Sequence, residues 1–302
     1  MSASPPPRCV ACGGSAFTDR RILPDLLTRT CTSCGLVSSA IERSDPTVAE
    51  FALVDQDAYL RSVGETRRLQ ARPILEVLTR QAAPGATLLD VGCSFGFFLL
   101  AARRAGFQIS GIEPDLQAYD YACRLLGDGV VRRGILDGDS VEPRSVDIVS
   151  TLDVIEHIPL LEHAAFAATV REALAARGIW VIKVPSTEGL YYKLSDLAAR
   201  THPRSGANLI RRMWQTRYQY PHLVYYSLRS LTLELESLGF RVVGHRYVAE
   251  LPTRTVIDRL STDGDISRRA AWLAAPAVMG VNLIDLARGK SDGLVVFARP
   301  AS

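Results

Sequence analysis

The sequence predicts an α/β protein in which a seven-stranded, mostly parallel sheet carries helices on both faces and follows a small metal-binding ribbon. Two observations predict it. Two Cys-x-x-Cys pairs stand near the start of the chain, and apolar strand-like runs alternate with helix-like segments after residue 85. A chain of 302 residues has room for about two domains. We therefore expect a ribbon over 1–45, a helical linker and lid over 46–84, and an α/β domain over 85–302 with insertions at 186–226 and 251–292.

The first four cysteines define the ribbon. Cys9 and Cys12 form one pair, and Cys31 and Cys34 form the other. Two such turns place four thiolates around one ion, which is the tetrahedral arrangement of a structural Zn²⁺ site. A closed shell of four sulfurs leaves no open position for substrate, so we expect this metal to stabilise the fold.

The elements after the ribbon follow from periodicity and from Gly and Pro punctuation. A helix is expected over 57–82, interrupted by Pro73. Strands are expected over 87–91, 108–112, 130–132, 146–152 and 179–184, with helices over 97–105, 114–126 and 160–176 between them. A helix over 227–238 and strands over 241–248 and 294–297 complete the sheet, with a helical insertion over 255–290.

Composition limits the classes of partner. The chain has 35 Lys and Arg against 32 Asp and Glu, so a nucleic-acid partner is not expected. Residues 1–8 contain no apolar run that would act as a secretion signal. The most apolar stretch, Trp272–Leu286, is interrupted by Pro276, Gly280, Asn282 and Asp285. We expect a soluble cytoplasmic protein without a transmembrane segment.

The loop over 92–96, between the first strand and helix of the α/β domain, has three interpretations. It matches G-x-S-x-G, which would make Ser94 a hydrolase nucleophile, but no oxyanion loop of the HGGG type precedes it. A dinucleotide site would need a third glycine where Phe97 and Phe98 stand.

The third interpretation fits best and rests on four motifs. Residues 88–99, 111–115, 147–159 and 178–186 resemble, in order, motif I, motif II and the segments at strands four and five of class I S-adenosylmethionine (SAM) methyltransferases. The strand-four segment resembles the small-molecule branch, which includes the ubiquinone-type O-methyltransferases. This resemblance implies a Rossmann-like methyltransferase sheet, methyltransferase activity and SAM as cofactor.

The resemblance also implies a set of cofactor contacts. Gly92 and Gly96 let the backbone pass close to the cofactor, and the Glu113 carboxylate would accept both ribose hydroxyls. Asp90 would anchor the loop and the cofactor ammonium, and Asp137 would take the adenine amine. The expected cofactor-binding residues are Asp90, Gly92, Cys93, Gly96, Glu113, Pro114, Asp137 and Asp153.

Three residues are candidates for catalysis: His157 as general base, His222 as a substrate contact and Tyr59 as an aromatic lid over the cofactor. The segment Asp153-x-x-Glu156-His157 also resembles the E-x-x-E-H divalent-metal site of ubiquinone-type enzymes, with Asp in place of the first Glu. These three residues would form a second metal site, for Mg²⁺.

The acceptor is described only by class. The insertion at 186–226 is rich in Tyr and Arg and is expected to form a substrate lid. The leading hypothesis is methyl transfer to a hydroxyl of a small molecule, sugar or glycan. The alternatives are a zinc-ribbon sugar C-methyltransferase, which carries a further C-terminal domain, an rRNA methyltransferase, which predicts a more basic ribbon, and a catalytically silent interaction module. The sequence does not determine the oligomeric state.

Overall fold

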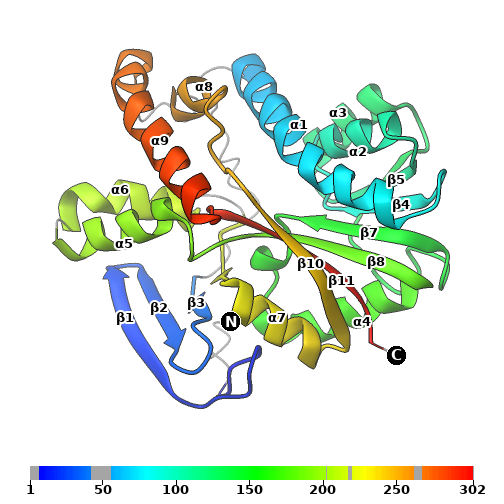
Figure 1. The fold of residues 1–302 in the computed structure, drawn as a ribbon, viewed down its shortest axis with the longest axis horizontal. Helices are drawn as coiled ribbons and strands as arrows, with labels where there is room; N and C mark the ends of the chain where they lie inside the picture. The colour runs from blue at the N-terminus through cyan, green and yellow to red at the C-terminus, as the bar shows by residue number, and fades with distance from the viewer. Residues whose placement is uncertain (1–6, 42–55, 202, 217–219, 262–266, 302) are drawn as a thin grey trace.

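The computed structural model describes residues 7–41, 56–201, 203–216, 220–261 and 267–301. Its strands form two sheets, a seven-stranded sheet in the body of the protein and a four-stranded sheet at the N-terminal end (Figure 1). The mostly parallel sheet and the small N-terminal sheet confirm the predicted fold class.

The large sheet has five parallel strands and an antiparallel edge. Strand β11 runs antiparallel to both of its neighbours, β10 and β8, and the other neighbouring pairs are parallel. In parallel sheets with helical crossovers, ligand sites lie at the carboxyl ends of the strands. In spatial order the strands are β10 (Phe240–Val248), β11 (Gly293–Pro300), β8 (Leu174–Pro185), β7 (Val146–Leu152), β4 (Thr87–Val91), β5 (Gln108–Glu113) and β6 (Val131–Arg133).

Helices cover both faces of this sheet (Figure 1). On one face, buried residues of the first three helices, such as Ile74 and Leu99, pack against Ile148. On the other face, Val170 and Leu231 pack around the buried Trp180. The helices are α1 (Gln56–Gln81), α2 (Phe97–Arg104) and α3 (Leu116–Leu126) on the first face, with α4 (His163–Ala173) and α7 (Leu228–Ser237) on the second.

Three element boundaries differ from the prediction. Helix α1 runs through Pro73 without a break, because its apolar face at Ile74 and Leu78 is held against the sheet. The helix expected over 160–176 is a short 3-10 turn, η2 (Leu160–Glu162), followed by α4, and it stops at Ala173. Strand β8 begins directly after the helix, at the buried Leu174. Tertiary packing overrode local propensity at these points.

The small sheet combines the N-terminal region with a distant segment. Its antiparallel order is β1 (Phe17–Leu23), β2 (Leu26–Cys31), β3 (Val37–Ser39) and β9 (Val224–Tyr225). Leu26 packs in one cluster with Trp214 and Tyr225. Cys9 and Cys34 belong to the core on the α4–α7 face. The N-terminal region therefore packs into the body of the protein.

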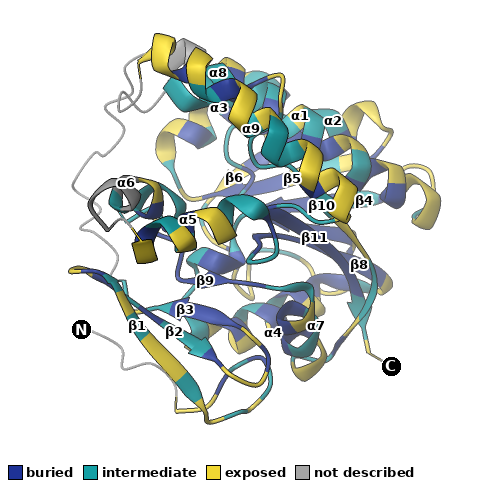
Figure 2. Ribbon diagram, turned by 60° about the vertical axis from the view of Figure 1, so that its left-hand side comes forward, coloured by how far each residue is buried: buried dark blue, intermediate teal, exposed yellow. Residues whose placement is uncertain are grey.

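The two insertions form helices. They are α5 (Leu190–Thr201), α6 (Pro203–Met213), α8 (Val256–Ser261) and α9 (Arg268–Arg288), and α5, α6 and α9 come to the front in Figure 2. The helical insertion expected over 255–290 contains α9, which continues through Pro276 and Gly280. By length and composition, α9 is the one helix in the described part of the chain that could cross a membrane.

Candidate active site

The loop after β4 is built on glycines that accept no side chain. Gly92 has φ +70°, and a Cβ there would lie 2.7 Å from Cγ2 of Val154. Gly96 caps α2 with φ +77°, and a Cβ there would lie 2.8 Å from Leu126. The Gly92 N–H donates to the Ile112 carbonyl at 2.8 Å, which ties the loop to β5. Positive φ and close approach together require glycine at both positions.

Glu113 ends β5 and faces this loop. Its Oε2 accepts a hydrogen bond from the Ser94 N–H at 2.7 Å, and its Oε1 accepts one from the Asp115 N–H at 2.8 Å. The side chain is buried, and burial raises the pKa of Glu113 while the two N–H donors oppose that shift. Each carboxylate oxygen keeps a further lone pair for another donor. Pro114 is exposed and precedes Asp115, which caps α3.

Asp90 and Cys93 lie beneath the loop. Asp90 is buried and accepts a hydrogen bond from Ser150 Oγ at 2.6 Å, and burial raises the pKa of Asp90 to about 7. Cys93 Sγ would lie 2.8 Å from a Cβ at Gly111, so the thiol fills space under β5. Burial raises the pKa of Cys93, as expected for an apolar packing residue.

Asp137 lies away from these buried groups. It is exposed on the segment between β6 and β7, and its carboxylate accepts a hydrogen bond from Ser140 Oγ, which also accepts the Asp137 N–H at 2.9 Å. The structure does not bring Asp137 into contact with Glu113 or Asp90.

Asp153, at the carboxyl end of β7, belongs to a buried charge network. Its Oδ1 is 2.5 Å from Nζ of the fully buried Lys183, and its Oδ2 pairs with Arg67 of α1. Burial opposes ionisation of Asp153, but the charges of Lys183 and Arg67 outweigh it and lower the pKa of this carboxyl. Asp153 has φ +61°, a strained conformation that persists because both cations hold it.

The same network extends to the segment directly after β10 and was not predicted from the sequence. Lys183 Nζ also lies 2.6 Å from Oε1 of Glu250. Gln70 of α1 donates to the Ala249 carbonyl at 2.9 Å. Buried charges and amides therefore hold α1 over the ends of β7, β8 and β10. The available signal was a lysine inside an otherwise apolar strand, which is rare unless the charge is paired.

Glu156, His157 and His222 converge next to this network. Glu156 and His157 lie on the 3-10 turn η1 (Ile155–His157), and His222 precedes β9. One ligand-type atom from each of the three residues lies within 4.8 Å of the other two, and the imidazole centroids are 5.0 Å apart. Glu156 is fully buried, and both carboxylate oxygens have no hydrogen-bond partner.

The hydrogen bonds of the two imidazoles define their tautomers. His157 Nδ1 lies 3.0 Å from the Pro221 carbonyl, which can only accept, so Nδ1 carries the proton. Tyr225 donates its hydroxyl proton to the Met213 carbonyl at 2.7 Å and can accept from His222 Nδ1 at 3.2 Å. In the neutral form, each ring therefore has its lone pair on Nε2. Burial, then the neighbouring His157, lowers the pKa of His222, so its ring stays neutral.

The predicted residues thus fall into separate groups. Asp153 is paired with cations, whereas Glu156 and His157 join His222, so the three residues of the expected E-x-x-E-H type of site do not share one cluster. Tyr59 lies in the first turn of α1, and its side chain is outside the described residues.

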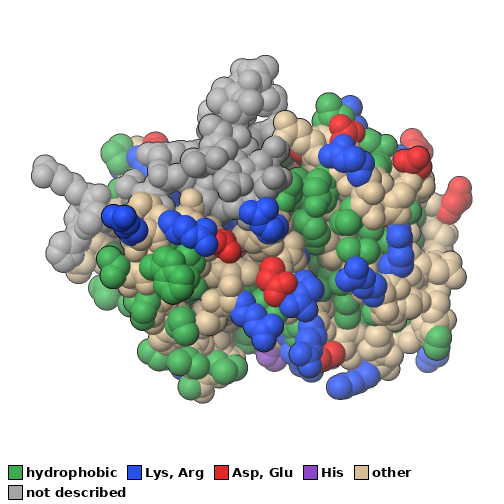
Figure 3. Space-filling view, turned by 90° about the horizontal axis from the view of Figure 1, so that it is seen from above, with side chains coloured by type: hydrophobic (Ala, Val, Ile, Leu, Met, Phe, Trp, Pro, Cys, Tyr) green, Lys and Arg blue, Asp and Glu red, His purple; other side chains and the backbone are tan. Residues whose placement is uncertain are grey.

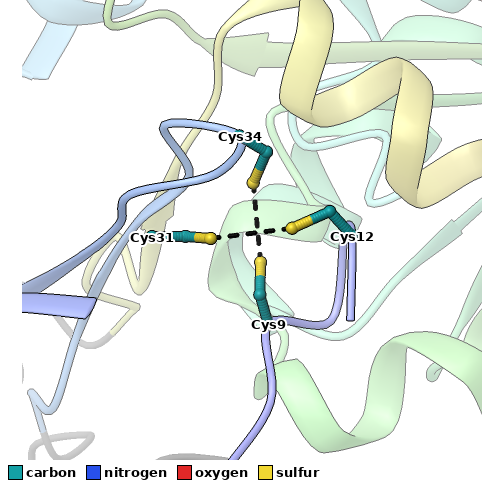
Figure 4. Close-up of side chains that lie close together, drawn as sticks. All are labelled: Cys9, Cys12, Cys31 and Cys34. Carbon is teal, nitrogen blue, oxygen red and sulfur yellow. Dashed lines mark hydrogen bonds between the residues drawn. The ribbon is translucent and has the colours of Figure 1, made fainter. Parts of the chain in front are cut away.

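The four cysteine sulfurs point to a common centre (Figure 4). The Sγ atoms of Cys9 and Cys34 are 3.6 Å apart, as are those of Cys12 and Cys31. Tetrahedral Zn²⁺ with Zn–S bonds of about 2.3 Å requires sulfurs about 3.8 Å apart, so the four thiols fit this ion.

Comparison with known proteins agrees with this geometry. Residues 63–245 match the protein family described as a methyltransferase domain. The ubiquinone biosynthesis O-methyltransferase of Xanthomonas campestris pv. campestris strain B100 is 33% identical over 89 residues, covering 28% of this chain and 37% of that protein. The matched segments span about two fifths of the length of the curated relatives.

Solved structures share the fold. A chain from the complex between the Haloferax volcanii Trm112 methyltransferase activator and a methyltransferase matches with TM-score 0.53 and 15% identity, covering 82% of this chain and 96% of that one. A SAM-dependent methyltransferase of Archaeoglobus fulgidus matches with TM-score 0.50 and 17% identity. The match covers 81% of this chain and 99% of that one. The family match covers more than half of the chain, so the protein belongs to the methyltransferase-domain family.

Proposed function

We propose that the protein is a SAM-dependent methyltransferase that transfers a methyl group to a hydroxyl of a small molecule, sugar or glycan. The observation that carries this proposal is the placement of two groups at the same end of the parallel sheet. The glycine loop and Glu113 follow β4 and β5, and the cluster of Glu156, His157 and His222 lies beyond the end of β7.

The residues present fit SAM. Glu113 would accept the ribose hydroxyls with the lone pairs that Ser94 and Asp115 leave free. Gly92 and Gly96 permit close approach of the backbone, and the buried Asp90 supports the loop from below. When bound, SAM would supply the activated methyl group, and the protein would contribute position and proton removal. Cys93, Pro114, Asp137 and Asp153 stay in the proposed set of cofactor neighbours, with Asp137 toward the adenine.

His157 is the proposed general base. A hydroxyl has a high pKa and must lose its proton as it attacks the methyl group. The Pro221 carbonyl holds His157 in the tautomer with a lone pair on Nε2, which can accept that proton. His222 would contact the acceptor as a neutral imidazole. Tyr59 remains a proposed lid residue.

A divalent ion is the second way to activate the hydroxyl. The unpartnered oxygens of Glu156 lie among ligand-type atoms of His157 and His222, and such a set could hold the ion that we expected on Asp153, Glu156 and His157. Two imidazoles suit a transition metal better than Mg²⁺, which prefers oxygen ligands. Full activity after dialysis against EDTA, with the cysteine site still loaded, would assign the role to His157 alone.

We also propose that Cys9, Cys12, Cys31 and Cys34 bind a structural Zn²⁺. The sulfur spacing supports it, and so does the burial of three of the four cysteines in the core. None of the six cysteines forms a disulfide, and metal-binding thiolates suit the reducing compartment that we propose for the protein, the cytoplasm.

Calorimetric titration of the metal-analysed protein with S-adenosylhomocysteine tests the cofactor assignment. We expect saturable binding in the micromolar range. A folded, zinc-loaded sample that does not saturate at millimolar ligand would refute the proposal and favour an interaction module. Deuterated SAM and a panel of phenols and sugars, read by mass spectrometry, then identify the acceptor, and the chemical shift of the methyl carbon in the product distinguishes O-methylation from C-methylation.

A further inference from the structure

Helix α9 exposes an apolar surface that is unusual for a helix at the outside of a protein. Trp272, Leu273, Leu283 and Leu286 are 63%, 83%, 66% and 77% exposed. The one charged residue between 270 and 287 is Asp285, which is buried. A helix that is apolar on all sides is normally covered by a protein core or by lipid.

The helix is nevertheless firmly attached along one side. Its buried residues are Ala271, Ala275 and Asp285, which lie on one stripe of the helix. Asn282 donates to the Leu251 carbonyl at 2.8 Å, and Asp285 accepts from the Leu190 N–H at 3.0 Å. These bonds attach the buried side of α9 to the body of the protein, so its other side faces outward.

Neighbouring helix α5 extends this surface. Tyr191 at the start of α5 donates its hydroxyl to the Val278 carbonyl of α9 at 3.0 Å. Farther along α5, Leu194 and Leu197 are 46% and 54% exposed. We define the apolar face as Leu194, Leu197, Trp272, Leu273, Leu283 and Leu286.

Positive charge accompanies the apolar face. The segments 190–216 and 267–290 contain nine Lys and Arg against two Asp. Three of these cations, Arg211, Arg268 and Lys290, pair with carboxylates outside the segments, Asp25, Asp258 and Glu188, so a smaller net positive charge remains. Arg268 and Arg269 begin α9, and Arg288 ends it. The view from above shows hydrophobic side chains gathered at one side with Lys and Arg side chains close by (Figure 3). An apolar helix face with basic residues at its borders suits anionic lipid headgroups.

We infer that the apolar face docks on a bilayer that contains anionic phospholipids, with α9 lying along the interface. The charge pattern favours lipid over a second copy of this chain. A two-fold dimer would place the same patch of each copy against the other and would bring the arginines of both copies together. A bilayer offers apolar chains to Leu273 and Leu283 and phosphates to Arg268 and Arg269.

Vesicle flotation with the full chain tests this inference. We expect binding to vesicles of phosphatidylcholine mixed with phosphatidylglycerol and much weaker binding to phosphatidylcholine alone. The double variant Leu273→Glu/Leu283→Glu should lower the partition coefficient by more than about tenfold, because both side chains leave the acyl boundary. Arg268→Ala/Arg269→Ala should lower it by about fivefold for each charge removed, and added salt should weaken binding.

Two controls make the result decisive. Leu161→Glu changes a residue on η2 that is 63% exposed and outside the apolar face, and its binding should equal that of the wild type. Thermal unfolding of each variant checks that the fold is retained, as expected for exposed positions. The inference is overturned if neither vesicle binds the protein, if Leu273→Glu/Leu283→Glu binds as the wild type, or if that variant converts a lipid-free dimer into a monomer in sedimentation equilibrium.

Discussion

Replacing Glu113 by Gln tests the cofactor site by exchanging one carboxylate oxygen for an NH₂ group with almost no change of shape. In the structure the two carboxylate oxygens accept separate N–H groups, from Ser94 at 2.7 Å and from Asp115 at 2.8 Å. The Gln oxygen can keep one of these bonds, but its NH₂ group meets the other N–H as a second donor. The variant therefore loses one bond to the protein and one acceptor for the ribose.

The size of both effects follows from these contacts. A buried N–H that loses its partner costs about 1–3 kcal/mol of the free energy of unfolding. A hydrogen bond to a charged group contributes about 1.5–3 kcal/mol, so the dissociation constant for S-adenosylhomocysteine should rise by about 10- to 100-fold. Calorimetry measures the affinity, and urea unfolding measures the stability.

Asp115→Asn is the matched control. Asp115 neighbours Glu113 and caps α3 by accepting from the Ala118 N–H at 2.8 Å, a role that Asn can keep. We expect its cofactor affinity to equal that of the wild type. If Glu113→Gln lowers the stability but binds S-adenosylhomocysteine as the wild type does, Glu113 is only a clamp between the loop and α3, and the reasoning is refuted.

Three further predictions concern metal, base and pH. Cys12→Ser should lose stoichiometric zinc and lower the unfolding temperature, measured by metal analysis and calorimetry, whereas Cys123→Ser should do neither; full zinc content in Cys12→Ser would exclude the site. His157→Ala should lower turnover by about 10²- to 10⁴-fold with unchanged affinity for S-adenosylhomocysteine, and wild-type turnover would place the base elsewhere. Burial raises the pKa of Asp292 from 3.8 to about 7, so the folded state binds the extra proton and stability falls as the pH rises from about 4 to 7, by up to about 4 kcal/mol. Asp292→Asn keeps an acceptor for the Tyr192 N–H at 3.0 Å and should flatten this slope in urea unfolding at pH 5 and pH 8; an unchanged slope would show that Asp292 does not cause it.

The features that the sequence predicted correctly are local ones. Alternating apolar runs and turn residues are read within a few residues, and they placed the parallel strands and their helices. The Cys-x-x-Cys spacing predicted that four thiols lie around one centre, and the structure confirms this cluster. Glu113 was placed at the end of its strand because an acidic residue there follows an apolar run. In each case the pattern and the structure involve the same short segment.

Three features of the site came only from the tertiary structure. Lys183 forms ion pairs with Asp153 and Glu250, and the three residues lie near the ends of three different strands. Strand β9 pairs with β3 of the N-terminal sheet although it lies nearly 200 residues farther along the chain. The sequence identified His222 as a candidate substrate contact. The distance of 5.0 Å between its ring centroid and that of His157 depends on how the 186–226 insertion folds. Burial decides which of these charges are paired and which lone pairs are free, and burial is a property of the whole packed chain. The same holds for α9, because the sequence predicted a helical insertion there but only the packing determines that most of this helix is exposed.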